Sequence, residues 1–193
     1  MANRERDVVL AIAAYSRSEK IEGRTLLQKL AYFLNELAKL DIPFEPGYYG
    51  PYSEAIANAT DSLVTLGFLK ETEERYPGGP SNVFEPRKYT YKLTEDGKTV
   101  FENVAAQDAP FFSSLQEAMS RITGSEECDY VFLSIAAKMA HILKSQKPES
   151  MSKDEIMSVA RELRWELSEE SIEKAADFLI GLGLVKKVPP EKS

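Results

Sequence analysis

Apolar residues recur three or four positions apart in three segments near the start of the chain, as on the buried face of an amphipathic helix. Gly23 interrupts the pattern after the first segment, and Pro43 cannot continue the second helix. Ser53 is a typical N-cap for the third helix, which stops at Gly67. The spacing therefore predicts three helices, over residues 4–17, from 24 or 25 to 40, and 53–66.

Short extended segments follow the third helix. Phe68–Lys70 leads into a polar tip at residues 76–82, and the chain returns through Tyr89–Leu93, whose aromatic and β-branched residues favour a strand. Thr94 is a suitable cap for a helix that continues through Ala105. Three short helices, two strands and a further helix are the element order of a winged helix.

The second half of the chain is predicted to be helical. Asp108–Pro110 is a short break, and Ser152–Glu155 fits the capping box S-x-x-E. The apolar spacing predicts four helices, over residues 111–122, 126–145, 152–165 and from 168 to 181 or 183. We therefore expect a mainly α fold with a small β-hairpin wing: a winged-helix-like domain at 1–106 and a helical domain at 107–193.

Two stretches of the chain share a similar sequence pattern. Ser62–Lys70 parallels Phe178–Lys186, because in both an apolar helix ends in Leu-Gly and is followed by two apolar residues and a lysine. A second, truncated winged-helix-like unit within residues 107–193 would explain the echo. It is equally explained by the usual sequence of a glycine-capped helix that leads into an extended segment.

Two regions resemble known families. Tyr91–Lys98 looks like the last wing strand and the next helix of many winged helix-turn-helix regulators, whose pattern is Y-x-L-T-x-x-G; Gly97 would let that helix pass close to its neighbours. Residues 21–34 and Tyr49–Ser53 resemble the YwgA-like group of bacterial and archaeal proteins. More remotely, they are similar to the Panacea/SocA-like antitoxin domain, which pairs a K-L-Q-K-L-x-Y helix with a later G-P. The resemblance covers roughly the first half of the chain and implies a winged-helix fold.

The composition excludes several kinds of site. The chain has 193 residues with one Cys and one His, which excludes an intramolecular disulfide and a metal site built from several thiolates or imidazoles. No apolar run approaches the roughly 18–20 residues of a membrane span, and the first residues show no signal-peptide pattern. We expect a cytoplasmic protein that uses no cofactor and no metal and is not an enzyme.

The single histidine and cysteine are weak catalytic candidates. His141 shares a helix face with Ser134, Lys138 and Ser145, so we expect it to be exposed to solvent. Cys128 lies among acidic residues, which raise a thiol pKa, and has no histidine nearby in the sequence. We therefore expect no catalytic residues.

The net charge is −7, from 24 Lys and Arg and 31 Asp and Glu. Residues 1–106 hold 13 basic and 16 acidic residues (13 − 16 = −3), and residues 107–193 hold 11 and 15 (11 − 15 = −4). Neither half is basic, so the electrostatic attraction that dominates DNA affinity is weak over the whole chain.

Analogy to the fold nevertheless makes a DNA-binding transcriptional regulator the leading hypothesis, with double-stranded DNA as its partner. Many winged-helix regulators dimerise, so we also expect a homodimer. On the third helix only Ser53 and Asn58 suit a base edge or a phosphate, beside the acidic Glu54 and Asp61. The candidate phosphate contacts lie on the wing and are Lys70, Arg75, Arg87, Lys88 and Lys92.

The alternative hypothesis is a protein–protein interaction module, antitoxin-like or an adaptor, on a winged-helix scaffold that does not bind DNA. Tyr48, Tyr49 and Tyr52 lie in a loop stiffened by Gly50 and Pro51, where their rings are candidate contacts for a protein partner. The same rings would otherwise fill the gap between the second and third helices. Their exposure distinguishes the two arrangements.

Overall fold

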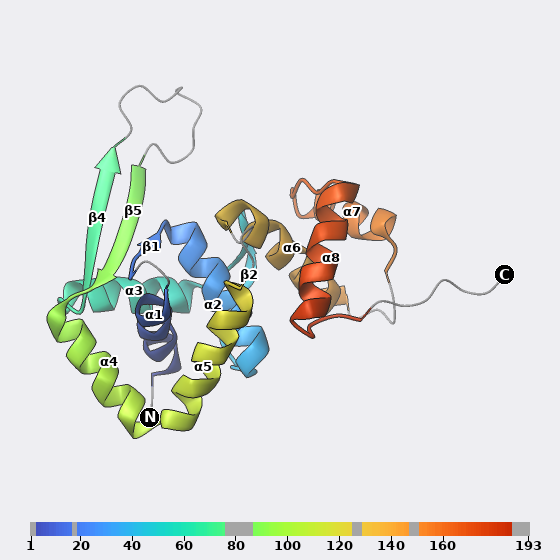
Figure 1. Cartoon of the computed structure of the whole chain (residues 1–193). Helices are drawn as coiled ribbons and strands as arrows, with labels where there is room; N and C mark the ends of the chain where they lie inside the picture. Colours follow the sequence, from blue (N-terminus) through green and yellow to red (C-terminus); the bar gives the residue numbers. More distant parts are fainter. Residues whose placement is uncertain (1–2, 17–18, 76–86, 125–128, 147–150, 187–193) are drawn as a thin grey trace.

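The computed structural model describes residues 3–16, 19–75, 87–124, 129–146 and 151–186. Over these residues the fold is mainly helical, with eight helices and two small antiparallel sheets (Figure 1). None of the described helices combines the length and the apolar character that crossing a membrane requires. The elements are α1 (Arg4–Tyr15), β1 (Ile21–Glu22), α2 (Arg24–Ala38), β2 (Glu45–Gly47), β3 (Gly50–Tyr52), α3 (Glu54–Thr65), β4 (Leu69–Arg75), β5 (Arg87–Leu93), α4 (Glu95–Gln107), α5 (Ala109–Ile122), α6 (Tyr130–Gln146), α7 (Lys153–Glu162) and α8 (Glu169–Gly181).

Helix α1 is the centre of the N-terminal part. Six consecutive residues, from Val8 to Ala13, are buried, because α2, α3, α4 and α5 all pack against this helix (Figure 1). A helix covered on several sides has no room for a polar face over that length, which explains why its apolar run is continuous.

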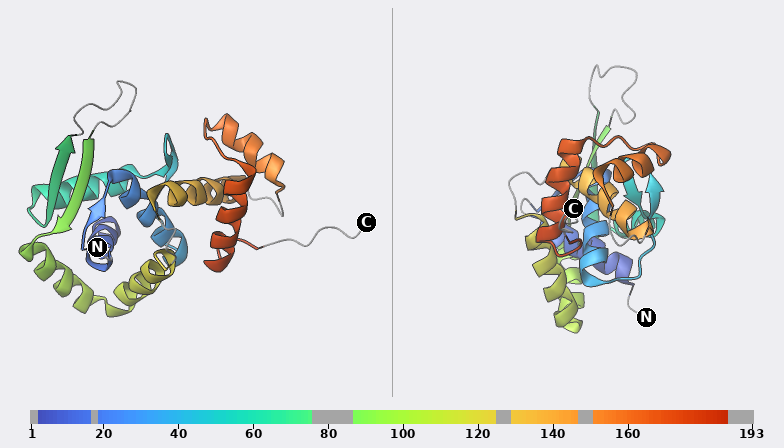
Figure 2. Two further views of the ribbon diagram at one scale, coloured as in Figure 1. Left: turned by 45° about the horizontal axis from the view of Figure 1, so that its top comes forward. Right: turned by 90° about the vertical axis from the view of Figure 1, so that its right-hand side faces the viewer.

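Helix α2 joins the two halves of the core. Residues 27–35 are all buried, since α1 covers one side of the helix and α5 and α6 cover others. Helices α5 and α6 lie in the predicted domain 107–193, yet their buried residues share one hydrophobic core with those of α1 and α2. In Figure 2, the β4–β5 strands and the α7–α8 pair lie at opposite ends of the molecule. The division at residue 106 stays a prediction.

The larger sheet has the strand order β1-β5-β4 and is antiparallel throughout. Tyr91 lies opposite Ile21, and Leu69 lies opposite Leu93, which directs these side chains toward the helices. Strand β1 was not expected, because two residues are too few to show an alternating pattern. The smaller sheet, β2–β3, occupies a segment that the sequence indicated as a loop.

Several predicted helix ends are confirmed by hydrogen bonds. The side chains of Ser53, Thr94 and Ser152 each accept a hydrogen bond from a backbone N–H in the first turn of the helix that follows. The break predicted after residue 107 is shorter than expected, since α5 already begins at Ala109. A proline in the first helical turn, here Pro110, costs no hydrogen bond.

The internal echo has a local explanation. Helices α3 and α8 end in the same cap, in which the residue after Gly67 or Gly183 donates its N–H to the carbonyl five positions back, at 2.9 Å in both. Strand β4 follows the first cap, whereas the described residues after the second, up to Lys186, form no strand. A second winged-helix-like unit stays a prediction.

Candidate functional site

Strands β2 and β3 form a hairpin that displays three tyrosine side chains. The strands pair from Glu45 opposite Tyr52 inward, so Tyr48 and Tyr49 form the turn. Exposed fractions are 71% for Tyr48, 40% for Tyr49 and 46% for Tyr52, and the first two rings meet edge to face with centroids 4.8 Å apart. The three rings therefore lie at the surface and do not fill the gap between α2 and α3.

Two neighbouring polar residues of α2 form hydrogen bonds with the backbone at the end of the hairpin, at Pro51 and Ser53. The amide nitrogen of Gln28 donates to the carbonyl of Ser53 at 3.0 Å, and its amide oxygen accepts from the N–H of Ser53 at 2.9 Å. Nζ of Lys29 donates to the carbonyl of Pro51 at 2.7 Å. Because these bonds go to backbone groups, they fix the path of the chain and leave the tyrosine rings outside.

The amine of Lys29 is deeply buried, with 2% of the residue exposed. Burial, and next the nearby charge of Lys138, lower the pKa of Lys29 to about 7. Gly50 makes this burial possible: a Cβ there would lie 3.1 Å from Cγ of Lys138 and 3.5 Å from Nζ of Lys29, and its φ is +105°. Only glycine readily combines that backbone conformation with so close an approach of β3 to α2 and α6.

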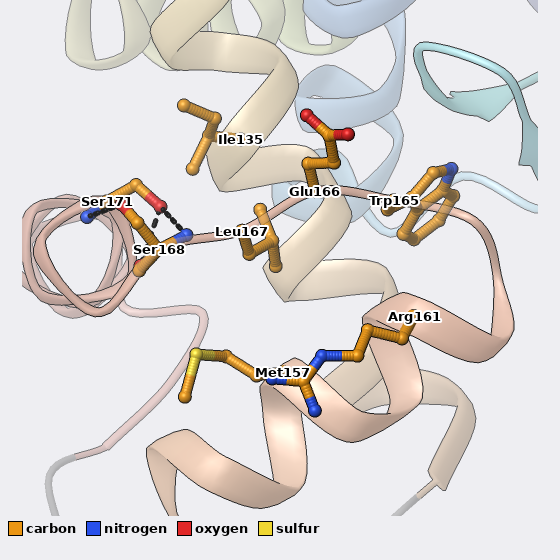
Figure 3. A pocket seen from close by; sticks show the side chains of 8 residues that line it. All are labelled: Ile135, Met157, Arg161, Trp165, Glu166, Leu167, Ser168 and Ser171. Carbon is orange, nitrogen blue, oxygen red and sulfur yellow. Dashed lines mark hydrogen bonds between the residues drawn. The ribbon is translucent and has the colours of Figure 1, made fainter.

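A groove of about 430 Å³ lies beside the hairpin, between α6, α7 and the segment that leads into α8 (Figure 3). Trp165 belongs to both features, because its indole lines the groove while Nε1 donates to the carbonyl of Gly47 at 2.8 Å. Met157 and Arg161 form the α7 side of the groove. No ion pair of Arg161 is found within the described residues. The groove therefore adds apolar surface and two opposite charges, Arg161 and Glu166, next to the hairpin.

The structure removes one residue from the predicted DNA contacts. Ser53 is 1% exposed, and its hydroxyl accepts a hydrogen bond in the first turn of α3, so it does not reach the surface. Asn58 is exposed on α3, together with Glu54 and Asp61. The exposed face of this helix thus carries acidic groups, which phosphates repel.

Two of the four basic residues on β4 and β5 whose side chains the structure describes form ion pairs. Arg87 forms an ion pair with Glu73 at 3.3 Å, and Lys88 forms one with Glu22 of β1 at 2.7 Å. Arg75 ends β4, and its side chain lies outside the described part of the chain. Paired cations attract a phosphate backbone less than free ones.

Lys70 and Lys92 differ from the other cations of β4 and β5. They lie directly opposite each other on β4 and β5, both are exposed, and neither forms an ion pair with a described residue. Like charges in cross-strand register destabilise a sheet. This pair is therefore the clearest candidate for an anion contact on these two strands.

His141 is not the solvent-exposed residue that its helix face indicated. It is half-buried, with its ring centroid 6.3 Å from that of Tyr32 and 5.9 Å from that of Trp165. Burial is the main cause that lowers the pKa of His141, which favours the neutral imidazole. The described residues contain no group of three or more His, Cys, Asp or Glu side chains placed to hold a metal. Cys128 lies outside these residues.

Sequence reasoning missed the groups that position the hairpin, namely Gln28, Lys29 and Trp165. The sequence pointed to these residues only weakly. Gln28 and Lys29 are two polar residues inside the apolar run of a helix, and Trp165 is the single tryptophan of the chain. The long apolar run from residue 26 to 34 indicates a helix that is buried on all sides. A polar residue within such a helix needs a buried hydrogen-bond partner, so Gln28 and Lys29 could have been expected to bind a neighbouring segment.

Comparison with known proteins relates part of the chain to a curated bacterial protein. No family model matches the chain. It is 37% identical over 93 residues to the uncharacterized protein YwgA of Bacillus subtilis. The match covers 46% of this chain, and it spans 50% of the curated relative, about half of that protein's length. The resemblance suggested by residues 21–34 and 49–53 is thus confirmed as distant homology to YwgA of Bacillus subtilis.

Proposed function

We propose that residues 4–107 form a winged helix with β4 and β5 as its wing. The order α1, α2, α3, β4, β5, α4 supports this assignment, as does the pairing of β1 with the outer edge of β5. Helix α3 packs on α1 and continues directly into β4. In this arrangement α3 occupies the place of a recognition helix.

We further propose that the protein is a non-enzymatic interaction module that binds a protein partner through Tyr48, Tyr49 and Tyr52. The observation that carries the proposal is a pair of exposed, mutually packed tyrosine rings on a hairpin whose backbone is bonded to buried side chains. Tyrosine rings bury a large area at a low cost in side-chain entropy. A hairpin that is already fixed also spares the cost of ordering it on binding.

The charges around the hairpin favour a protein partner over DNA. Glu45 is exposed on β2, and Glu54 is exposed at the start of α3. Hot spots of protein interfaces are rich in tyrosine, whereas DNA interfaces need unpaired cations. The geometry thus supports the interaction module better than the regulator.

Replacing Tyr48 and Tyr49 together by Ser should weaken binding of the partner by roughly 1,000-fold, because central aromatic contacts cost about 2 kcal/mol each when removed and every 1.4 kcal/mol is about tenfold. The partner is first identified by affinity capture from the source cells with the unmodified protein. Its affinity for both forms is then measured with purified components by isothermal titration calorimetry.

The matched control is Tyr130→Ser, since Tyr130 is 54% exposed on α6 and is not part of the hairpin. It should bind the partner like the unmodified protein. A partner that binds the double variant as tightly as the unmodified protein would contradict the proposal.

Double-stranded DNA is the second candidate partner, and the unpaired Lys70 and Lys92 favour it. Binding of pooled genomic duplexes is measured by fluorescence anisotropy at several salt concentrations. If the wing binds phosphates, replacing both lysines by Gln should lower the magnitude of the salt slope by about 2, because each phosphate contact contributes about 0.9. Exposed Lys39 and Lys186 replaced by Gln serve as control. No binding at low salt excludes this candidate.

A further inference from the structure

The hairpin carries a carboxylate beside one of its exposed tyrosine rings. Glu45 of β2 lies directly opposite Tyr52 of β3. Residues that face each other in this way project to the same side of an antiparallel pair, with Cβ atoms about 5 Å apart. Tyr52 is 46% exposed, and Glu45 is exposed as well. The Glu45–Tyr52 pair therefore presents a negative charge and an aromatic ring together at the surface.

A second cross-strand pair of the same two residue types shows what such a pair can hold. Glu71 of β4 lies opposite Tyr91 of β5. Arg24 binds both, because its Nε donates to the Tyr91 hydroxyl at 3.0 Å and its Nη2 donates to Oε2 of Glu71 at 3.3 Å. Its guanidinium also lies over the ring of Tyr89, with Cζ 3.8 Å from the ring centroid. A glutamate and tyrosines side by side on paired strands thus suit a guanidinium, which stacks on a ring while it donates to a carboxylate.

No cation of the described residues occupies the Glu45–Tyr52 pair. Within residues 3–16, 19–75, 87–124, 129–146 and 151–186, Glu45 forms no ion pair, and no basic side chain lies over the ring of Tyr52. Lys29, beneath the hairpin, donates to the backbone of Pro51 instead. Glu45 acts on the pKa of His141, but burial favours the neutral imidazole, which brings no positive charge. A cation for this pair has to come from outside the described residues.

The segment around the pair is acidic. Residues 41–54 include Asp41, Glu45 and Glu54 and contain neither lysine nor arginine. Glu54 follows Tyr52 by two positions, is exposed at the start of α3, and forms no ion pair within the described part of the chain. Complementary charge steers a partner toward an interface, and like charge excludes the wrong one, so this surface selects a basic segment.

We propose that the partner of the tyrosine hairpin presents an arginine whose guanidinium stacks on Tyr52 and forms an ion pair with Glu45. The inference rests on the proposed function, because it specifies the chemistry of the partner at that same surface. Arginine fits this pair better than lysine does, since a planar guanidinium stacks on a ring and donates to a carboxylate at once, whereas an ammonium is a compact point charge. A neighbouring basic residue of the partner pairs with Glu54.

The first test uses a blocked peptide, acetyl-Arg-Gly-Arg-Gly-Arg-amide, at low ionic strength, where exposed ion pairs are least screened. Proton NMR follows the ring signals of Tyr52, which are assigned by their loss in Tyr52→Phe. The peptide should shift these signals in a saturable manner, and the peptide with lysine in place of arginine should bind at least about threefold more weakly.

Glu45→Gln should weaken binding of the arginine peptide by about threefold to fivefold, the size of one exposed ion pair. The matched control is Glu117→Gln, which removes the same charge from an exposed position on α5 and should leave the affinity unchanged. Unshifted Tyr52 signals, equal binding of the lysine peptide, or equal binding by Glu45→Gln would each overturn the proposal.

The captured partner separates this inference from the proposed function. Glu45→Gln, with a Tm equal to that of the unmodified protein, should weaken the complex by at least about fivefold, because an ion pair enclosed in an interface is less screened by solvent. If the double Tyr48 and Tyr49 variant loses binding and Glu45→Gln does not, the hairpin is the binding surface and the arginine contact is wrong. If neither variant weakens the complex, the partner does not use the hairpin, and both proposals fail.

Discussion

Lys29→Met should remove most of the increase in folding stability that the unmodified protein gains between pH 7 and pH 10. The pKa of Lys29 is about 7 in the folded state, against an ordinary value of 10.5. Below pH 7 the amine is charged in both states, and the full cost of burying the charge lowers stability. Above pH 7 the folded state loses the proton while the unfolded state keeps it, so stability rises by about 1.4 kcal/mol per pH unit. The whole gain is on the order of 4–5 kcal/mol.

The check is urea unfolding at pH 6, 7.5 and 9, followed by the fluorescence of Trp165. The difference in unfolding free energy between the unmodified protein and Lys29→Met reports Lys29 together with the neighbouring Lys138, whose charge acts on it, and cancels the titrations of more distant groups. Lys70→Met is the matched control, because Lys70 is exposed on β4 and should leave the pH dependence unchanged. Parallel pH profiles for Lys29→Met and the unmodified protein would show that the buried amine keeps an ordinary pKa.

Gly97→Ala should destabilise the protein by about 3 kcal/mol or more. A Cβ at Gly97 would lie 2.0 Å from the carbonyl oxygen of Phe68 and 2.9 Å from its carbonyl carbon. Neither atom can turn away, because that carbonyl also accepts the N–H of Thr94 at 3.1 Å where β5 meets α4. The helix would have to move away from the start of β4, which would open the core beneath it.

Gly181→Ala is the control for this prediction. Gly181 ends α8, has no left-handed backbone conformation, and a Cβ there would meet nothing within 4 Å. Alanine at such a helical position is neutral or stabilises by up to about 1 kcal/mol. The two variants are compared by urea unfolding at one pH. A loss below about 1 kcal/mol for Gly97→Ala would mean that α4 can shift without cost.

The helices were predictable because their signals are local. Apolar spacing located α1, α2 and α3, and the hydroxyls of Ser53, Thr94 and Ser152 marked helix starts that the structure confirms. An N-cap needs only a hydroxyl and the next turn of the chain, so sequence alone suffices. The close approach of Gly97 to the backbone of Phe68 was also expected, because Gly97 lies in the first turn after the cap Thr94.

The candidate site was only partly predictable. Tyr48, Tyr49 and Tyr52 were candidate partner contacts from the loop that carries them, and their exposure is observed. The pairing of β2 with β3 was not predicted, since its three-residue strands contain two prolines and two glycines. Ser53 shows the limit of local reasoning: as a cap it was predicted correctly, and as a surface residue it was not. Its burial depends on Gln28, 25 positions away in the chain.

The sequence by itself determined a mainly helical chain with a hairpin after the third helix, because helix periodicity, caps and turn glycines act over a few residues. The tertiary structure alone decided the environment of Lys29, His141 and Tyr32. Each sits on a helix whose own pattern says nothing of the elements that cover it. Whether a polar side chain is solvated, paired or left without a partner depends on desolvation by distant segments, and that is set only when α2, α6 and the hairpin pack together.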